Sequence, residues 1–268
     1  AYLALVWQFT GFSVEATRAA MLAVAAFGVT FTFLLAIRLS RSLPGTPAFW
    51  PPILLMLSPL FFTQAVMAQL DMPAMVLTVL ALYLFLEGRT AASVAACTAL
   101  VLVKETSVVV PLVFAAWLVK EGYWRRALLF LLPLIPLAGW LALVAARTGT
   151  PFGTHQFAEY NLTYPLHPVR LAVAVLRRAY AIFLADFHWA GVVAVALAWK
   201  PLTDALRPMR REWTVTALVA AAQVAVVTVL GGATLERYLL PVWPLLYIAV
   251  SAAWTVLEKR RRLALQFV

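Results

Sequence analysis

The sequence predicts an all-α, polytopic transmembrane protein. Hydrophobic residues make up 64% of the 268 residues and charged residues only 12%, whereas soluble domains carry about a quarter of charged residues. The apolar residues occur in runs that approach the length of a membrane span, and short polar segments separate them. The ten-residue alternation typical of a membrane β-barrel is absent. Because backbone groups inside a bilayer must be satisfied internally, we expect these runs to be helices.

Nine runs are expected to cross the membrane. In chain order they are 14–39, 49–66, 72–87, 90–104, 106–119, 126–146, 186–199, 213–230 and 239–257. Several are shorter than the roughly 20 residues of a full span, so their boundaries are approximate. Together they predict one transmembrane domain that covers residues 1–268.

The distribution of lysine and arginine predicts the orientation. If each run crosses once, 14 of the 21 basic residues fall on one side, which we expect to be cytoplasmic. The other seven are Arg18, Lys104, Arg147, Arg170, Arg177, Arg178 and Arg237. The net charge of +10 is therefore spread over short loops, which argues against a nucleic-acid partner. The composition, rich in Ala, Leu, Val and Arg, indicates a bacterial inner membrane protein.

Residues 147–185 are expected to form an external loop followed by an interfacial helix. One crossing, 186–199, suffices to connect the outer loop to the cytoplasmic Lys200. The helix expected over 169–184 then lies along the membrane surface. Its arginines suit contact with lipid phosphates, and simple snorkelling of these side chains explains them equally well.

Ionisable residues gather at the expected outer ends of the runs. Asp71 lies in MAQLDMPAM, Lys104 and Glu105 in VLVKETSVVVP, Arg237 in GGATLERYLLPVWP, and Arg18 in VEATRAAM. Because ionisable groups at membrane depth cost several kcal/mol unless they are paired or hydrated, such residues indicate a functional site.

A purely structural interpretation competes at each position. Asp71 suits a helix N-cap with Pro73 in the first turn. Lys104 and Glu105 suit an interfacial turn, and Arg237 suits snorkelling. The sequence offers no metal-binding spacing, no phosphate-binding glycine loop and no cysteine pair.

Four segments resemble a known family when they are taken in order. They are FTGFSVEATRAAMLAVAAFGVTFTFLLAIRLS, SPLFFTQAVMAQLDMPAMVLTVLALYLFLEGR, ALVLVKETSVVVPLVFAAW and ERYLLPVWPLLYIAVSAAW. The chain resembles the GT-C superfamily of membrane glycosyltransferases, in the branch of protein O-mannosyltransferases and lipid A aminoarabinose transferases. The resemblance implies a polyprenyl-phosphate sugar as donor. It also implies an acceptor hydroxyl on a protein, lipid or glycan at the non-cytoplasmic face.

The resemblance also implies roles for individual residues. Arg18 matches the arginine that follows the first external loop, and Asp71 matches an L-D-x-P/L turn. Lys104, Glu105 and Pro111 match a Lys-containing turn loosely, whereas Arg237, Tyr238 and Pro241 match a late R-Y-x-x-P element. This assigns catalysis to Asp71 and Glu105, and substrate or phosphate binding to Arg18, Lys104, Arg237 and Tyr238. Asp71 is left with three roles: orienting the acceptor, assisting a base, or coordinating a divalent metal ion.

One departure from the family keeps two functions open. The family's main catalytic acid lies in its first external loop, a region that would precede Ala1, so we expect the chain to lack the first helix and that loop. The first hypothesis is a polyprenyl-phosphate-dependent glycosyltransferase. The alternative is a non-catalytic GT-C-like structural subunit of a larger membrane assembly.

Overall fold

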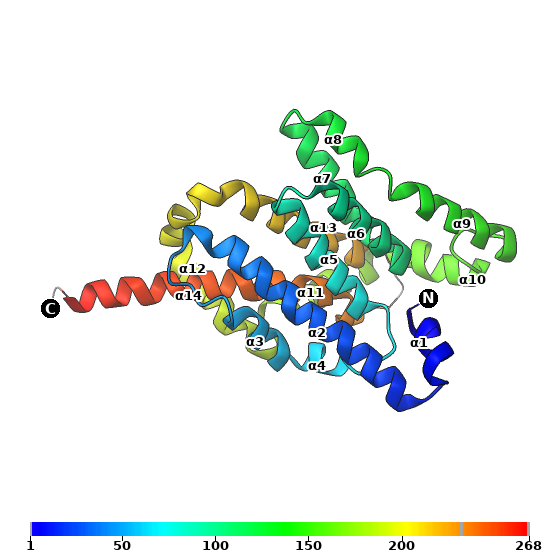
Figure 1. The fold of residues 1–268 in the computed structure, drawn as a ribbon, viewed down its shortest axis with the longest axis horizontal. Helices are drawn as coiled ribbons and strands as arrows, with labels where there is room; N and C mark the ends of the chain where they lie inside the picture. The colour runs from blue at the N-terminus through cyan, green and yellow to red at the C-terminus, as the bar shows by residue number, and fades with distance from the viewer. Residues whose placement is uncertain (1, 231–232, 267–268) are drawn as a thin grey trace.

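The computed structural model describes residues 2–230 and 233–266, and it is built from helices (Figure 1). The first half contains α1 (Tyr2–Thr10), α2 (Val14–Leu39), α3 (Trp50–Leu57), α4 (Pro59–Gln64), α5 (Asp71–Leu86), α6 (Thr90–Val103) and α7 (Val109–Lys120). The second half contains α8 (Trp124–Leu129), α9 (Leu134–Thr148), α10 (His155–Ala158), α11 (Pro168–Phe183), α12 (His188–Ala205), α13 (Arg210–Val229) and α14 (Trp243–Gln266). Single turns of tighter or wider helix join them: η1 (Ser40–Ser42), η2 (Glu105–Val108), η3 (Glu159–Thr163), η4 (Tyr164–Leu166), η5 (Ala185–Phe187), η6 (Arg207–Met209) and η7 (Glu236–Val242). The all-α prediction is confirmed, since the described residues contain no strand.

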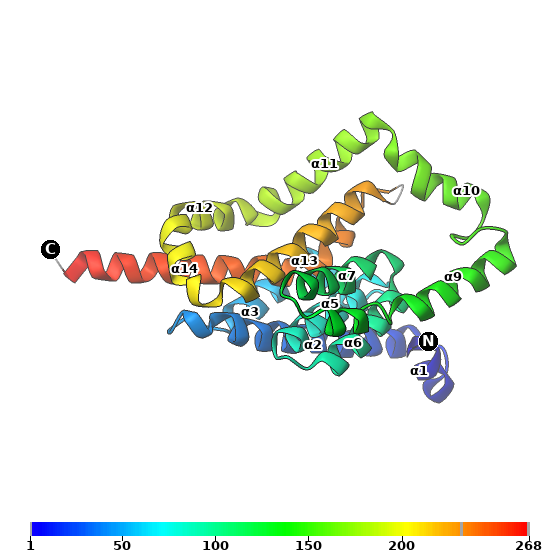
Figure 2. The same cartoon turned by 90° about the horizontal axis from the view of Figure 1, so that it is seen from above.

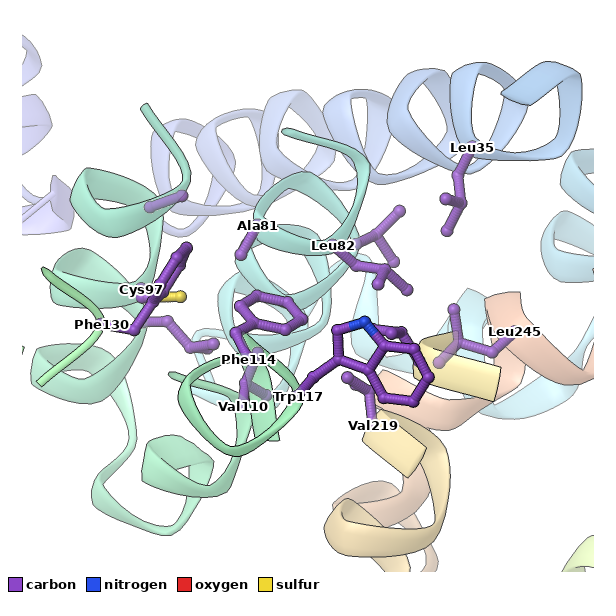
Figure 3. Packing of buried hydrophobic residues seen from close by; sticks show 14 of the residues in the cluster. Leu35, Ala81, Leu82, Cys97, Val110, Phe114, Trp117, Phe130, Val219 and Leu245 are labelled. Carbon is purple, nitrogen blue, oxygen red and sulfur yellow. The ribbon is translucent and has the colours of Figure 1, made fainter. Parts of the chain in front are cut away.

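Helix α5 lies in the centre of the molecule, with α2, α6 and η7 packed around it. It is apolar on all sides, which is typical of a helix buried within a bundle. Three aromatic rings pack α5, α7 and the residue after α8 together, and Figure 3 labels two of them, Phe114 and Phe130. The Phe114 ring stacks on Phe85 at 4.2 Å between centroids and meets Phe130 edge-on at 5.5 Å.

Two glycines allow helices to approach closely. A Cβ atom added to Gly28 of α2 would lie 2.6 Å from the Met75 side chain of α5. One added to Gly191 of α12 would lie 2.7 Å from Val250 of α14. Small residues at such contacts are typical of helix packing within membranes.

Among the described residues, four helical segments are long and apolar enough to cross a membrane: Val14–Ser42, Trp124–Thr148, Arg207–Val229 and Glu236–Arg261. A fifth is available if Pro168–Phe183 and Ala185–Ala205, bent by 48° at their junction, form one broken span. Helices α5 and α6 are apolar but shorter. The protein is therefore an integral membrane protein, whereas the number of nine spans stays a prediction.

The expected span 49–66 is divided into two short helices. Helix α3 ends at Leu57, Ser58 is extended, and α4 restarts at Pro59. The residue before a proline is disfavoured in helical conformation, and the proline suits the first turn of a new helix. A local backbone preference thus breaks an apolar run that composition alone reads as continuous.

The helix expected over 169–184 is present as α11. After it, Asp186 and Phe187 adopt left-handed conformations with φ of 49° and 64°, and α12 begins at His188. In Figure 2 the chain from α9 through α10 to α11 follows an arc that leads away from α5 and returns toward α12. Whether α11 lies along the membrane surface stays a prediction.

Candidate functional site

Asp71 is the first residue of α5, and its side chain is only 6% exposed. The interpretation of Asp71 as a helix cap is wrong. Leu70 occupies the N-cap position, and no side-chain hydrogen bond caps this helix. Both carboxylate oxygens instead contact cations from other parts of the chain.

Lys104 supplies the first of these cations. Helix α6 ends before it because Lys104 is extended, with φ −151° and ψ 110°. Its ammonium group donates a hydrogen bond to Asp71 Oδ1 and lies 4.5 Å from the centroid of the Tyr238 ring. The aromatic face and the carboxylate together stabilise an ammonium group in this buried position.

Arg237 supplies the second cation, from the start of η7. Its Nε lies 3.2 Å from Asp71 Oδ2, an ion pair without hydrogen-bond geometry at Nε. The Arg237 side chain is 32% exposed, more than Asp71 or Lys104. Arg237 is therefore the cation of this group that a ligand reaches most easily.

Tyr238 connects three cations to the same place. The Lys104 ammonium lies 4.5 Å from its ring, the Arg237 guanidinium 5.6 Å and the Arg178 guanidinium 5.8 Å. We call Asp71, Lys104, Arg178, Arg237 and Tyr238 the Asp71 cluster. It contains one carboxylate and three cations, and the cations remain in excess when Glu236, which interacts electrostatically with Arg178, is counted as well. Its electrostatic character therefore favours an anionic ligand.

Arg178 was missed as a cluster member. The arginines of α11 do not all face lipid phosphates or snorkel, because Arg170 and Arg178 are 7% and 2% exposed. Arg178 donates hydrogen bonds to Leu235 O at 2.6 Å and Val227 O at 3.4 Å. Arg170 donates one to Thr228 O at 2.8 Å. They therefore satisfy the Val227 and Thr228 carbonyls at the end of α13, where helical partners run out, and Arg178 also holds the segment before η7 through Leu235 O.

Helical spacing contained the signal for this arrangement. Arg170, Ala174, Arg178 and Ala181 lie three or four residues apart and form the buried face of α11. Small residues between the arginines let the helix approach α13 closely. Arg177 falls on another face and is exposed, with a hydrogen bond to Thr234 Oγ1 at 2.8 Å.

Two other predicted site residues lie apart from these contacts. Arg18 is exposed near the start of α2, and Glu105 is exposed at the start of η2. Within the described residues, no ion pair joins either side chain to the Asp71 cluster. The structure therefore brings together Asp71, Lys104, Arg237 and Tyr238, and leaves the proposed roles of Arg18 and Glu105 as predictions.

No metal site is visible in the described part of the chain, since no three His, Cys, Asp or Glu side chains converge there. His155 at the start of α10 and His167 just before α11 are both exposed. A divalent ion beside Asp71 stays a prediction from the family resemblance.

Comparisons with known proteins place the fold. No protein-family model matches the chain, and no curated protein matches it in sequence. Two crystal structures of ArnT from Cupriavidus metallidurans match it in three dimensions, with 18% sequence identity over 94% of this chain. The structure bound to undecaprenyl phosphate has a TM-score of 0.61 and the apo structure 0.57. The chain spans about half of the ArnT length, 48%.

ArnT, the lipid A aminoarabinose transferase, has the GT-C fold. The predicted resemblance is thereby confirmed at the level of the fold.

Proposed function

We propose that this protein is a membrane glycosyltransferase that takes its sugar from a polyprenyl-phosphate donor. The observation that carries the proposal is the Asp71 cluster, in which Lys104 and Arg237 are held on the two oxygens of one buried carboxylate. The fold likeness to ArnT, one structure of which binds undecaprenyl phosphate, supports the same donor class.

The proposed reaction uses these cations on the leaving group. An acceptor hydroxyl attacks the anomeric carbon of the sugar, the bond from that carbon to the phosphate oxygen breaks, and polyprenyl phosphate departs. Negative charge grows on the phosphate during this step, and fixed cations lower its energy. Arg237 contacts the phosphate in this scheme, and the more buried Lys104 adds positive charge behind Arg237.

Asp71 acts as a positioning residue in this scheme. Both of its oxygens contact cations, so the carboxylate orients Lys104 and Arg237 instead of taking the acceptor proton. The proton then needs another base. Glu105 is exposed and adjacent to Lys104 in the chain, and we propose it for that role.

The side of the reaction follows from the basic loops. We propose the non-cytoplasmic face of a bacterial inner membrane, because most lysines and arginines belong to the loops on the other side. The acceptor is a hydroxyl compound on that face.

Binding of undecaprenyl phosphate to the purified protein in nanodiscs tests the donor site. Arg237→Gln should weaken binding about tenfold, the factor expected for one charge-assisted hydrogen bond. Lys104→Arg, which keeps the charge beside Asp71, should weaken it less. The matched control is Arg89→Gln, an exposed arginine just before α6 at the opposite end of that helix from Lys104. Equal binding by Arg237→Gln and the parent protein would overturn the donor site.

A non-catalytic role is favoured by the fact that the Asp71 contacts join three segments of the chain. Asp71 joins the start of α5, the end of α6 and η7, as a purely structural ion cluster would. The two functions separate in a transfer assay with a panel of undecaprenyl-phosphate sugars, measuring release of undecaprenyl phosphate. Binding without release in any of them supports the structural subunit.

A further inference from the structure

A second polar region lies beside the Asp71 cluster, and its residues are different. A cavity of ≈ 720 Å³ is bounded by the loop before α11, by α11 and by the segment before η7. Its lining includes Tyr160, Tyr164, His167, Arg170, Arg177 and Thr234. Asp71, Lys104, Arg237 and Tyr238 do not line it.

The polar groups of this cavity are suited to an anion. The lining residues include two arginines, a histidine, two tyrosines and a threonine, and none of the described lining residues carries a carboxylate. Glu159 of the same loop lines a separate, smaller cavity. Guanidinium groups bind phosphate oxygens through paired hydrogen bonds, so a phosphate ester is the matching ligand.

Arg177 is the side chain best placed to meet such a ligand. It is exposed, and its bond to Thr234 Oγ1 uses one of the five N–H donors of its guanidinium group. Arg170 is buried behind it and held by Thr228 O, so its charge is fixed in position. The site therefore combines one preordered cation with one accessible cation.

Two tyrosines add aromatic rings and hydroxyl groups to the wall of the cavity. The rings of Tyr160 and Tyr164 are parallel within 8°, with centroids 5.7 Å apart, and both are half exposed. Tyrosines with an apolar body and a polar tip are typical of the lipid headgroup region. Their hydroxyl groups, with that of Thr234, match a headgroup that carries hydroxyls of its own.

The apolar walls distinguish a lipid from a soluble phosphate ester. Val169 and Val173 line the cavity from α11. Leu176 and Tyr180 continue the same exposed face of α11 beyond it. The volume is more than twenty times the roughly 30 Å³ of a water molecule, so a lone phosphate ion leaves most of it unfilled.

We propose that this cavity binds the headgroup of an anionic glycerophospholipid of the surrounding bilayer, with an acyl chain along the exposed face of α11. Arg177 holds the phosphate, the fixed charge of Arg170 behind it adds to the attraction, and the tyrosine and threonine hydroxyls hold the glycerol. Its lining residues differ from those that contact Asp71, and the one direct link between the two regions is the hydrogen bond from Arg178 to Leu235 O of the lining.

Native mass spectrometry of the whole chain, titrated with phosphatidylglycerol, tests the proposal. Arg177→Gln should weaken phosphatidylglycerol binding about tenfold, as expected for the loss of one charge-assisted hydrogen bond. The matched control is Arg147→Gln, an exposed arginine at the end of α9 that does not line the cavity, and it should leave binding unchanged. Phosphatidylcholine, whose headgroup has no net charge, should bind more weakly than phosphatidylglycerol.

Three results would overturn the proposal. Equal binding by Arg177→Gln and Arg147→Gln would show that phosphatidylglycerol does not use this cavity. Binding of glycerol 3-phosphate as tight as that of phosphatidylglycerol would assign it to a soluble ester. A loss of undecaprenyl phosphate binding in Arg177→Gln, with phosphatidylglycerol binding retained, would make the cavity part of the donor site. Failure of the donor proposal is detected by a different measurement, the binding of undecaprenyl phosphate to Arg237→Gln.

Discussion

The two ends of α5 carry ionic groups of different kinds. At its start, one carboxylate, Asp71, faces Lys104 and Arg237, with Arg178 close behind Tyr238. Just past its end, Glu87 lies 2.8 Å from Arg38 and 3.3 Å from Arg41. A helix of 16 residues separates the two groups by about 24 Å.

The numbers of charges differ between these ends. Around Glu87, a second carboxylate, Glu212, lies 3.4 Å from Arg38, so two carboxylates meet two arginines. Around Asp71, cations outnumber carboxylates. A balanced network joins helix ends and needs no further partner, whereas an excess of buried cations calls for an anion. We therefore propose that the start of α5 is the functional end and that the other end is structural.

The largest difference that we predict between the two ends of α5 is that they lie on opposite sides of the membrane. Cysteines replacing Glu105 and Arg89, at the two ends of α6, should react with an impermeant maleimide from opposite faces of sealed vesicles. The natural Cys97 is buried and serves as the unreactive background. Labelling of both positions from one face would remove the assignment of the Asp71 cluster to the non-cytoplasmic side.

Removing one carboxylate at each end should cost very different amounts of stability. Asp71→Asn leaves buried cations without their counter-charge, which we expect to lower the free energy of unfolding by about 3 kcal/mol. Glu87→Gln acts on partly exposed pairs and should cost about 1 kcal/mol or less. Unfolding of both variants in detergent, followed by tryptophan fluorescence, gives the two values. Similar losses would mean that the Asp71 cluster is an ordinary structural network.

At the start of α5, two variants of Tyr238 test whether its aromatic ring or its hydroxyl group stabilises the Asp71 cluster. Tyr238→Leu removes the ring from Lys104, Arg178 and Arg237, and we expect it to cost about 1 kcal/mol of stability through lost cation–π contacts. Tyr238→Phe keeps the ring face and should stay close to the parent. A phenylalanine variant as unstable as the leucine variant would instead assign the effect to the hydroxyl group.

The smallest effect is expected at Arg41, whose side chain is 58% exposed. Arg41→Gln removes a solvent-screened partner of Glu87 and should change the stability by no more than about 0.5 kcal/mol. Because exposed pairs are screened by salt, the difference from the parent should vanish at high ionic strength. A difference that persists in high salt would show that the Glu87 end is less exposed to water than its side-chain accessibilities indicate.

Much of the architecture was predictable because composition and apolar run length dictate it. Apolar runs in a membrane protein must be helical, since their backbone groups have no other partners in lipid. The helix expected over 169–184 appeared as Pro168–Phe183, and four predicted site residues from three distant segments met at one place.

Other features depended on the tertiary structure. The continuity of the run 49–66 did not follow from its length, because Ser58–Pro59 divides it into two helices, a local effect that a hydropathy average conceals. Arg18 and Glu105 carry the right residue types at the expected helix ends, yet both are exposed there. Sequence spacing gives a helix end but not the direction in which its side chains face other segments.

The sequence by itself determined that this chain is a helical membrane protein with Asp71, Lys104, Arg237 and Tyr238 as its notable polar residues. Only the tertiary structure decided what Asp71 does, because a carboxylate at a helix start caps that helix or pairs with cations according to what packs beside it. It likewise decided the burial of Arg170 and Arg178, since their partners are carbonyls at the end of α13 and in the segment before η7, some fifty residues later in the chain. Helical periodicity places such side chains on a common face, and the packing of distant segments determines which face is buried.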